Sequence, residues 1–268
     1  MGKATMKTNR YAAIMLHIFR KGFQRGMIEF PFTREDINDA ASELGISLPK
    51  NLGDVVYSFR YRAAFPDEII RTQPQGHEWI IEGAGKSKYR FRLVPHNRIL
   101  PRNDLISIKI PDATPEIIGN YALGDEQALL AKVRYNRLVD VFLGVTAYSL
   151  QNHLRTTVRG VGQIEVDEIY VALDKHGRQF VIPIQAKGGH DQHGVVQTTQ
   201  DISFCAAKFP DLLCRPVSVQ FMEDGTIAMF ELVESEGTVK VLDEKHYQLV
   251  PAAAITPEEL VIYSRGAK

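Results

Sequence analysis

Three side chains near the ends of two apolar segments have the types that metal-dependent hydrolysis requires. Asp167 lies in the segment GQIEVDEIYVALD, and Gln185 and Lys187 lie near the end of RQFVIPIQAKGG. Carboxylate and amide oxygens are ligands that Mg²⁺ prefers, and an ammonium can balance negative charge that develops on a phosphoryl group. A cation held by such ligands polarises a phosphoryl oxygen and activates a water. The three residues therefore indicate phosphodiester hydrolysis.

A β-hairpin would position these residues. Glu165 and Asp167 alternate with apolar residues in the first segment, as Gln185 and Lys187 do in the second, and this period of two is typical of strands. The turn residues DKHG, 174–177, separate the two segments. Antiparallel pairing would bring the polar side chains together on one face. Pro183 within the second strand would interrupt its hydrogen bonds and predicts a bulge.

Helices are expected on both sides of this hairpin. One should run from Asp125 to about Phe142, followed by a short helical stretch in TAYSLQNHL. After the hairpin, a helix is expected from about Gln192 to Phe209, and then the strand CRPVSVQFM. The residues after 222 predict further strands, with a short helix and strand at 251–263. This order predicts an α/β (α+β) core with a mixed central sheet.

The hairpin and its motif resemble the PD-(D/E)XK superfamily of restriction-endonuclease-like nucleases, over residues 125–222. Asp167 matches the first acidic residue of the family pattern, and Gln185-Ala186-Lys187 matches its acid-X-Lys triplet. The triplet here begins with glutamine in place of the commoner aspartate or glutamate, and a Gln-X-Lys variant of the superfamily has the same replacement. The resemblance implies a Mg²⁺ (or Mn²⁺) cofactor bound by Asp167, the Gln185 amide oxygen and the Ala186 carbonyl, with Lys187 orienting water or balancing charge.

The glutamine removes one negative charge from the expected metal site. Glu165, on the same strand face as Asp167, could restore this charge. Glu126, on the preceding helix, is a second candidate, because many members of the superfamily add a helical glutamate. The glutamine also leaves open a non-catalytic DNA-binding regulator with a disabled nuclease fold. A third possibility is a nuclease that acts on branched or repair intermediates.

The first part of the chain has the features of a DNA-binding module. Residues 1–115 carry 18 lysines and arginines against 12 acids, a net charge of +6, whereas the whole chain is neutral. A helix is expected to follow the N-cap Thr33, with Asp36 completing a capping box and Gly45 ending it. Pro49 should begin a second helix, and residues 79–81 and 88–94 should form a hairpin. Helices followed by a basic hairpin predict a mainly helical, winged-helix-like domain.

The expected DNA contacts come from the second helix and the hairpin of this module, and from the polar segment before Asp167. They are polar or cationic side chains on faces that the apolar residues do not use: Lys50, Asn51, Ser58, Arg60, Arg62, Lys86, Lys88, Arg90, Asn152 and Arg155.

Taken together, the 268 residues predict a winged-helix-like domain over 1–115 and a nuclease domain over 116–268. No apolar run is long enough to span a membrane, and the polar N-terminus does not resemble a signal peptide. We therefore expect a cytoplasmic protein whose two cysteines, Cys205 and Cys214, stay reduced. Its expected partners are double-stranded DNA, a second copy of the chain in a homodimer, and a companion DNA methyltransferase.

Overall fold

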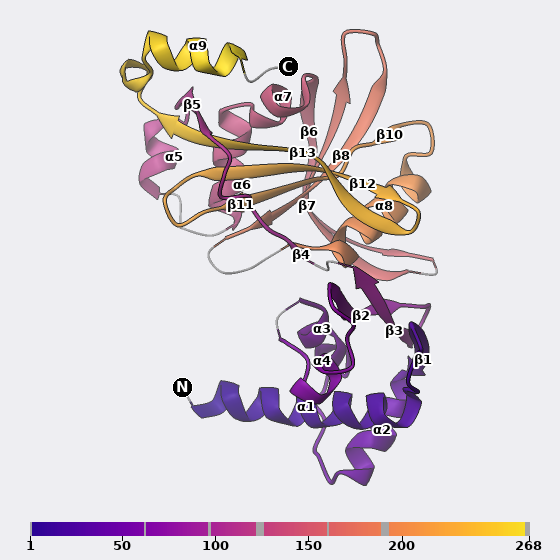
Figure 1. Cartoon of the computed structure of the whole chain (residues 1–268). Helices are drawn as coiled ribbons and strands as arrows, with labels where there is room; N and C mark the ends of the chain where they lie inside the picture. Colours follow the sequence, from indigo (N-terminus) through magenta and orange to yellow (C-terminus); the bar gives the residue numbers. More distant parts are fainter. Residues whose placement is uncertain are drawn as a thin grey trace. The chain divides into compact units, whose positions relative to one another are not determined.

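The chain divides into two compact units, which Figure 1 shows in a computed structural model. The structure describes residues 2–61, 63–95, 98–121, 126–159, 161–188 and 193–265. Unit 1 comprises residues 1–98, 157–163 and 194–196, and unit 2 comprises residues 99–156, 164–193 and 197–268. Residues 99–115, expected in the first domain, belong to unit 2 because the strand β5 (Ser107–Pro111) pairs with β13 (Thr238–Val250) in the large sheet.

Unit 1 combines helices with a small antiparallel sheet. Its strands have the order β1-β3-β2, so the predicted hairpin of β2 and β3 gains a third strand beside β3. The elements are α1 (Gly2–Gly22), β1 (Glu29–Thr33), α2 (Arg34–Glu43), α3 (Gly53–Tyr61), α4 (Asp67–Ile70), β2 (His77–Gly83) and β3 (Lys88–Pro95).

An aromatic core holds unit 1 together. Trp79 and Phe91 are buried between the sheet and α1, where Phe19 contacts both rings edge to face. Phe30 of β1 stacks on Phe91 with 4.9 Å between ring centroids. The indole nitrogen of Trp79 donates to the Thr72 hydroxyl at 2.8 Å, so the ring is buried without losing its hydrogen bond.

The predicted helix boundaries in unit 1 are partly confirmed. Thr33 caps α2 and exchanges hydrogen bonds with Asp36 as the capping box requires, and Gly45 has a φ of 64° just after the helix. The second helix begins at Gly53 and not at Pro49, because the Asn51 side chain caps it by accepting from the Gly53 amide at 3.1 Å. The strand β1 and the short helix α4 were not predicted.

Unit 2 is built on an eight-stranded mixed sheet. Seven strands form the path β5-β13-β12-β11-β8-β7-β6, and β10 pairs with β8 off this path. The elements not yet named are α5 (Glu116–Tyr121), α6 (Glu126–Tyr135), α7 (Leu138–Leu143), β6 (Thr146–Val158), β7 (Gly162–Leu173), β8 (Gln179–Lys187), α8 (Val195–Lys208), β10 (Leu213–Cys214), β11 (Val217–Phe221), β12 (Ile227–Ser235), a 3₁₀ turn η1 (Ala252–Ala254) and α9 (Pro257–Arg265). Two short strands, β4 (Arg98–Ile99) and β9 (His193–Gly194), pair separately. The predicted mixed α/β class is confirmed.

The main core of unit 2 lies between the sheet and the helices α6 and α7. Leu130 and Val133 of α6 pack against Ile182 and Ile184 of β8, and Tyr170 of β7 belongs to the same cluster. The side chains of β7 and β8 that alternate with these residues therefore face the other side of the sheet, where α8 lies.

The hairpin of β7 and β8 is confirmed, and so is its turn at residues 174–177. Pro183 pairs in register with Ile169, so the predicted bulge is wrong. The proline is tolerated because the neighbouring strand is interrupted opposite it. There β10 pairs with β8 up to Val181, and β11 begins its pairing only at Ile184.

Three other expectations for unit 2 are wrong. The single helix predicted over 125–142 is two helices, α6 and α7, separated at Arg137, which has a φ of 51°. Residues 146–154, predicted as helical, belong to β6, because pairing with β7 overrides a weak local preference. At the end of the chain the predicted short helix is confirmed as α9, over 257–265, but the predicted strand is wrong, because the described residues after 250 form no strand.

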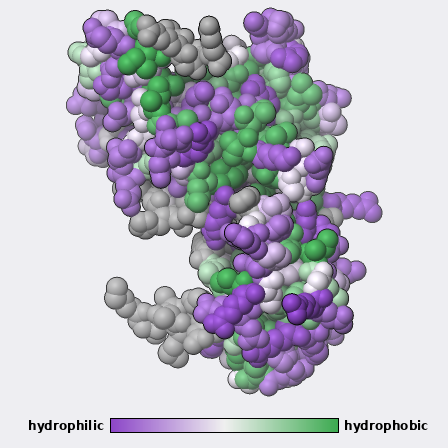
Figure 2. Space-filling view, in the orientation of Figure 1, coloured by the Kyte–Doolittle hydropathy of each residue, from purple (hydrophilic) through white to green (hydrophobic). Residues whose placement is uncertain are grey.

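Apolar side chains remain exposed on unit 2. On the face seen in Figure 2, hydrophilic residues cover most of unit 1, whereas larger apolar patches lie on unit 2. Helix α9 exposes three consecutive apolar residues, Leu260, Val261 and Ile262, by half or more. Among the helices that the structure describes, none is long and apolar enough to cross a membrane.

The capping box of α2 generates a stability prediction for unit 1. We expect Thr33→Ala to destabilise the unit by about 1 kcal/mol, because the Asp36 amide loses its side-chain acceptor. Trp79, the single tryptophan of the chain, is buried in unit 1, so its fluorescence during urea unfolding reports on this unit. Ser42→Ala, at an exposed position of the same helix, should leave the urea midpoint unchanged or slightly higher. Equal midpoints for Thr33→Ala and the unmodified chain would refute this role of the cap.

Candidate active site

The predicted site residues share one face of the central hairpin. Glu168 of β7 pairs with Ile184 of β8, which places the preceding Asp167 beside the following Gln185. Both side chains alternate with the core residues of the α6 and α7 face, so they face α8. Lys187 lies two residues beyond Gln185 on the same face.

Asp167 joins the two strands through its side chain. Its Oδ2 atom accepts a hydrogen bond from the Ala186 amide at 2.8 Å, so the carboxylate contacts the middle residue of the Gln-X-Lys triplet. Burial raises the pKa of Asp167, and the Glu165 carboxylate adds to this effect, whereas the Ala186 amide and the Lys187 ammonium lower the pKa. The charged carboxylate therefore depends on cationic or donor groups around it.

Gln185 is almost fully buried, with 2% of its surface exposed. Its amide nitrogen donates to the Glu165 carbonyl oxygen at 2.9 Å and to Asp201 Oδ1 at 3.1 Å. With the nitrogen engaged in both bonds, the amide oxygen is the atom of this side chain that can bind a cation.

Asp201, on α8, is a member of the site that the sequence reasoning missed. It is 2% exposed, and burial raises its pKa well above the usual range, with the nearby Asp167 carboxylate acting in the same direction. Thr198, Asp201 and Cys205 follow the spacing of the buried stripe of α8. An acid at an apolar-stripe position was the available signal, because buried carboxylates are rare without a partner.

Lys187 is the lysine whose positive charge acts on both Asp167 and Asp201. It lowers the pKa of both Asp167 and Asp201, so its ammonium lies within range of both carboxylates. It also faces His193, whose pKa burial lowers to about 3, so this imidazole is neutral. His193 Nε2 lies 2.6 Å from the Thr198 hydroxyl, which anchors the start of α8.

Glu165 lies beside two basic side chains of the neighbouring strand β6. Its Oε1 atom accepts from Arg155 at 3.0 Å and lies 3.6 Å from His153 Nε2. His153 has a φ of 49°, an uncommon backbone conformation for a residue within a strand. Arg155, predicted to contact DNA, and Glu165, predicted as a catalytic acid, thus form one pair beside Asp167.

Two other predicted residues of this region lie elsewhere. Glu126 begins α6, which packs on the opposite face of the sheet, and it is not among the groups that shift the pKa of Asp167. Asp201 is the helical acid on the face of the sheet that carries Asp167, because it accepts from Gln185 and its pKa is raised by Asp167. Asn152 lies within hydrogen-bonding distance of Arg134, Ser149 and Glu168, a network distinct from the Asp167 centre.

The predicted DNA contacts of unit 1 divide by exposure. Lys50, Asn51, Lys86 and Lys88 are exposed, whereas Ser58, Arg60 and Arg90 are half-buried. Ser58 donates to the Asp54 carbonyl within α3. Arg62 lies outside the described residues.

The cationic face predicted for the hairpin of unit 1 is partly neutralised. Arg90 forms ion pairs with Glu82 at 2.8 Å and Glu29 at 3.4 Å, and Arg92 contacts Glu82 at 3.0 Å. Both acids lie on strands that flank β3, so the excess positive charge remains at the turn, on Lys86 and Lys88. Counting charge along β3 alone missed this pairing.

The donor set suits a hard divalent cation such as Mg²⁺. The half-buried Asp167 lies close enough to the buried Asp201 to make ionisation of Asp201 less favourable, and a cation between the two groups would offset that cost. The Gln185 amide and the Ala186 peptide supply further oxygen atoms. Among the described residues, no group of three or more His, Cys, Asp or Glu side chains could hold a metal, so these amide oxygens would have to complete the ligand set.

Comparison with known proteins gives no family assignment. No protein-family model, no curated protein and no solved structure matches this chain significantly.

The raised pKa of Asp201 generates a prediction about pH. A carboxyl group with a raised folded-state pKa stabilises the fold below its unfolded pKa, about 4, and this contribution is lost as the pH rises through the folded value. In EDTA, the calorimetric melting temperature of the unmodified chain should therefore fall relative to that of Asp201→Asn as the pH increases from 4 to 8. The asparagine can still accept from Gln185 but cannot ionise. A difference between the two proteins that does not change with pH would contradict a raised pKa.

Proposed function

We propose that this chain is a Mg²⁺-dependent endodeoxyribonuclease of the restriction type, with a restriction-endonuclease-like core. The observation that carries the proposal is the convergence of Asp167, Gln185 and Lys187 with the buried Asp201 on one face of the β7–β8 hairpin. The central order of α6, α7, three antiparallel strands, α8 and the parallel strand β11 also supports such a core.

The residues divide into ligands and a charge-balancing group. Asp167 and Asp201 would hold the cation, with the Gln185 amide oxygen and the Ala186 carbonyl as further ligands. The cation would polarise a phosphoryl oxygen and lower the pKa of an attacking water. Lys187 would hold its ammonium near both carboxylates and balance negative charge that develops on the phosphoryl group.

Asp201 bears on the choice between an active nuclease and a non-catalytic DNA-binding regulator with a disabled nuclease fold. The glutamine of the triplet favours a non-catalytic DNA-binding regulator only if it leaves the site one carboxylate short. Asp201 Oδ1 accepts directly from the Gln185 amide, so α8 supplies a carboxylate where the triplet lacks one. This contact favours the catalytic proposal, in which Asp201, in place of Glu165 or Glu126, would be the acid that compensates for Gln185.

Unit 1 would bind the duplex as a winged-helix-like module. Support comes from α2 and α3, the hairpin of β2 and β3, and the exposed Lys50, Lys86 and Lys88. Cutting both strands would require two active sites, so we propose a homodimer as the active form. A restriction enzyme would also need a companion methyltransferase to protect host DNA.

The catalytic proposal predicts cation-dependent cleavage. The purified chain should cut long duplex DNA of mixed sequence with Mg²⁺ and not with EDTA. Asp167→Ala, Lys187→Ala and Asp201→Asn should each reduce cleavage by at least about 100-fold, because each removes a ligand or the balancing charge. DNA affinity measured in EDTA should stay within a factor of about three of the unmodified chain.

Lys175→Ala is the matched control for this experiment, because Lys175 is exposed in the hairpin turn away from the site. It should cleave like the unmodified chain. Mg²⁺-independent nicking, or full activity in the Asp167 and Lys187 variants, would overturn the proposed site. Binding of duplex DNA by the unmodified chain without any cleavage would support the regulator.

The wing of unit 1 generates a separate prediction. Lys86→Ala and Lys88→Ala should each weaken duplex DNA binding at low salt and reduce the slope of log affinity against log salt by roughly one, the value for one lost phosphate contact. Arg90→Ala should have a smaller effect, because Glu82 and Glu29 already pair with Arg90. Fluorescence anisotropy over a series of salt concentrations measures both quantities. Unchanged slopes in both lysine variants would exclude the wing from the interface.

A further inference from the structure

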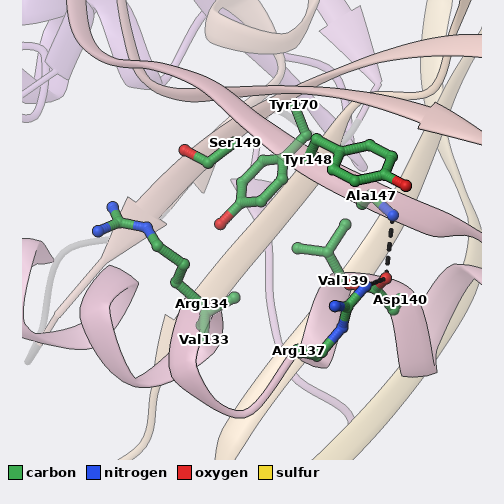
Figure 3. A pocket seen from close by; sticks show the side chains of 9 residues that line it. All are labelled: Val133, Arg134, Arg137, Val139, Asp140, Ala147, Tyr148, Ser149 and Tyr170. Atoms are coloured by element: carbon green, nitrogen blue, oxygen red, sulfur yellow. Dashed lines mark hydrogen bonds and ion pairs between the residues drawn. The ribbon is translucent and has the colours of Figure 1, made fainter.

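A polar cavity lies on the α6 and α7 face of the sheet in unit 2. Its volume is about 290 Å³. Its walls come from α6, α7, β6 and β7, and Figure 3 shows the lining side chains Val133, Arg134, Arg137, Val139, Asp140, Ala147, Tyr148, Ser149 and Tyr170. The alternation of β7 separates this cavity from the proposed active site, because Tyr170 and Asp167 face opposite sides of the strand.

A buried hydroxyl group lies at the base of this cavity. Tyr170 is 4% exposed, and its Oη atom makes no hydrogen bond of normal geometry, although Arg134 and Glu168 lie close enough to influence its pKa. Figure 3 shows this hydroxyl directed toward the helices, on the side of Arg134. Leaving a buried hydroxyl without a well-formed hydrogen bond costs free energy. A ligand that supplies a hydrogen-bond acceptor or donor at this point would recover that cost.

The arginines of the cavity are already paired with carboxylates. Arg134 Nη2 lies 2.8 Å from the fully buried Glu168, which also accepts from the Ser149 hydroxyl at 2.8 Å. Arg137 pairs with Asp140, which accepts in addition from the Ala147 amide. Each positive charge is thus balanced locally. The lining favours a neutral ligand with donors and acceptors at its edge over an anion.

The shapes of the lining groups favour a flat ligand. Two tyrosine rings and two guanidinium groups present planar surfaces, and Tyr148 is 57% exposed, so its ring is available for stacking. Val139 and Ala147 add apolar contact area. We propose that this cavity binds one nucleobase, stacked on Tyr148 and hydrogen-bonded by the Tyr170 hydroxyl. The base could belong to a free nucleoside or to an unpaired nucleotide of a DNA strand, because both present the same edge and faces.

Fluorescence of 2-aminopurine tests this proposal, because the base is quenched when it stacks. The full chain, in EDTA to prevent cleavage, is titrated with 2-aminopurine deoxyriboside, with a single strand containing the base, and with the matched duplex. Saturable quenching of the nucleoside or of the single strand supports the proposal, and the stronger of the two identifies the source. Absence of quenching in both, at millimolar protein or ligand, would overturn it.

Two variants locate the binding within the cavity. Tyr148→Ala should weaken binding by about tenfold or more through lost stacking. Tyr170→Phe should weaken it by about five- to tenfold, while the melting temperature of the free protein stays the same or rises, because the lost hydroxyl makes no hydrogen bond of normal geometry. Tyr121→Ala, at an exposed position outside the cavity, and Tyr247→Phe, at a buried one, are the matched controls and should bind normally.

The variants also give outcomes that contradict the proposal. Unchanged affinity in both Tyr148→Ala and Tyr170→Phe would exclude the cavity as the site of quenching. Competition by inorganic phosphate at constant ionic strength would show that the cavity selects an anion and not a base. Neither result depends on the proposed cleavage, because the assay contains no divalent cation and the Asp167 centre lies on the other face of the sheet.

Discussion

The buried amide of Gln185 is the interaction on which the geometry of the candidate site depends. Its nitrogen donates to the Glu165 carbonyl of β7 and to the Asp201 carboxylate of α8, so one side chain fixes three elements. Each buried polar group left unpaired would cost about 1–3 kcal/mol, which strongly favours the arrangement that satisfies all of them. Helix α8 is therefore held with its acid toward the strands, and Asp167 meets the Ala186 amide in the same arrangement.

This arrangement places two carboxyl groups where water is scarce. Burial raises the pKa of both Asp167 and Asp201, and the Asp167 carboxylate makes ionisation of Asp201 less favourable still. The Lys187 ammonium lowers the pKa of both acids, but its single positive charge cannot balance two fully charged carboxylates. The neutral His193, with a pKa of about 3, adds no charge. The balance of charge thus gives a physical reason for expecting a cation at this centre, independent of any resemblance in sequence.

The sequence predicted the features that arise from local patterns. Alternation and turn residues indicated the β7–β8 hairpin, and the Thr33 capping box indicated the start of α2, because both signals lie within a few residues. Pairing between distant segments was not predictable in this way. The edge strand β6 is exposed over most of its length and shows no clean alternation, so only its pairing with β7 defines it. Asp201 was missed because its role depends on which strands α8 covers.

The strand β7 carries polar groups on both faces, and its register therefore couples the two sites. Asp167 faces α8, whereas the next residue, Glu168, is fully buried on the α6 side and pairs with Arg134. A shift of one residue in the pairing of β7 with β8 would exchange the two faces. It would turn the Glu168 carboxylate away from Arg134 and the Asp167 carboxylate away from the Ala186 amide. Both faces thus penalise the same error, so the polar residues that could serve function also specify the alignment of the central hairpin.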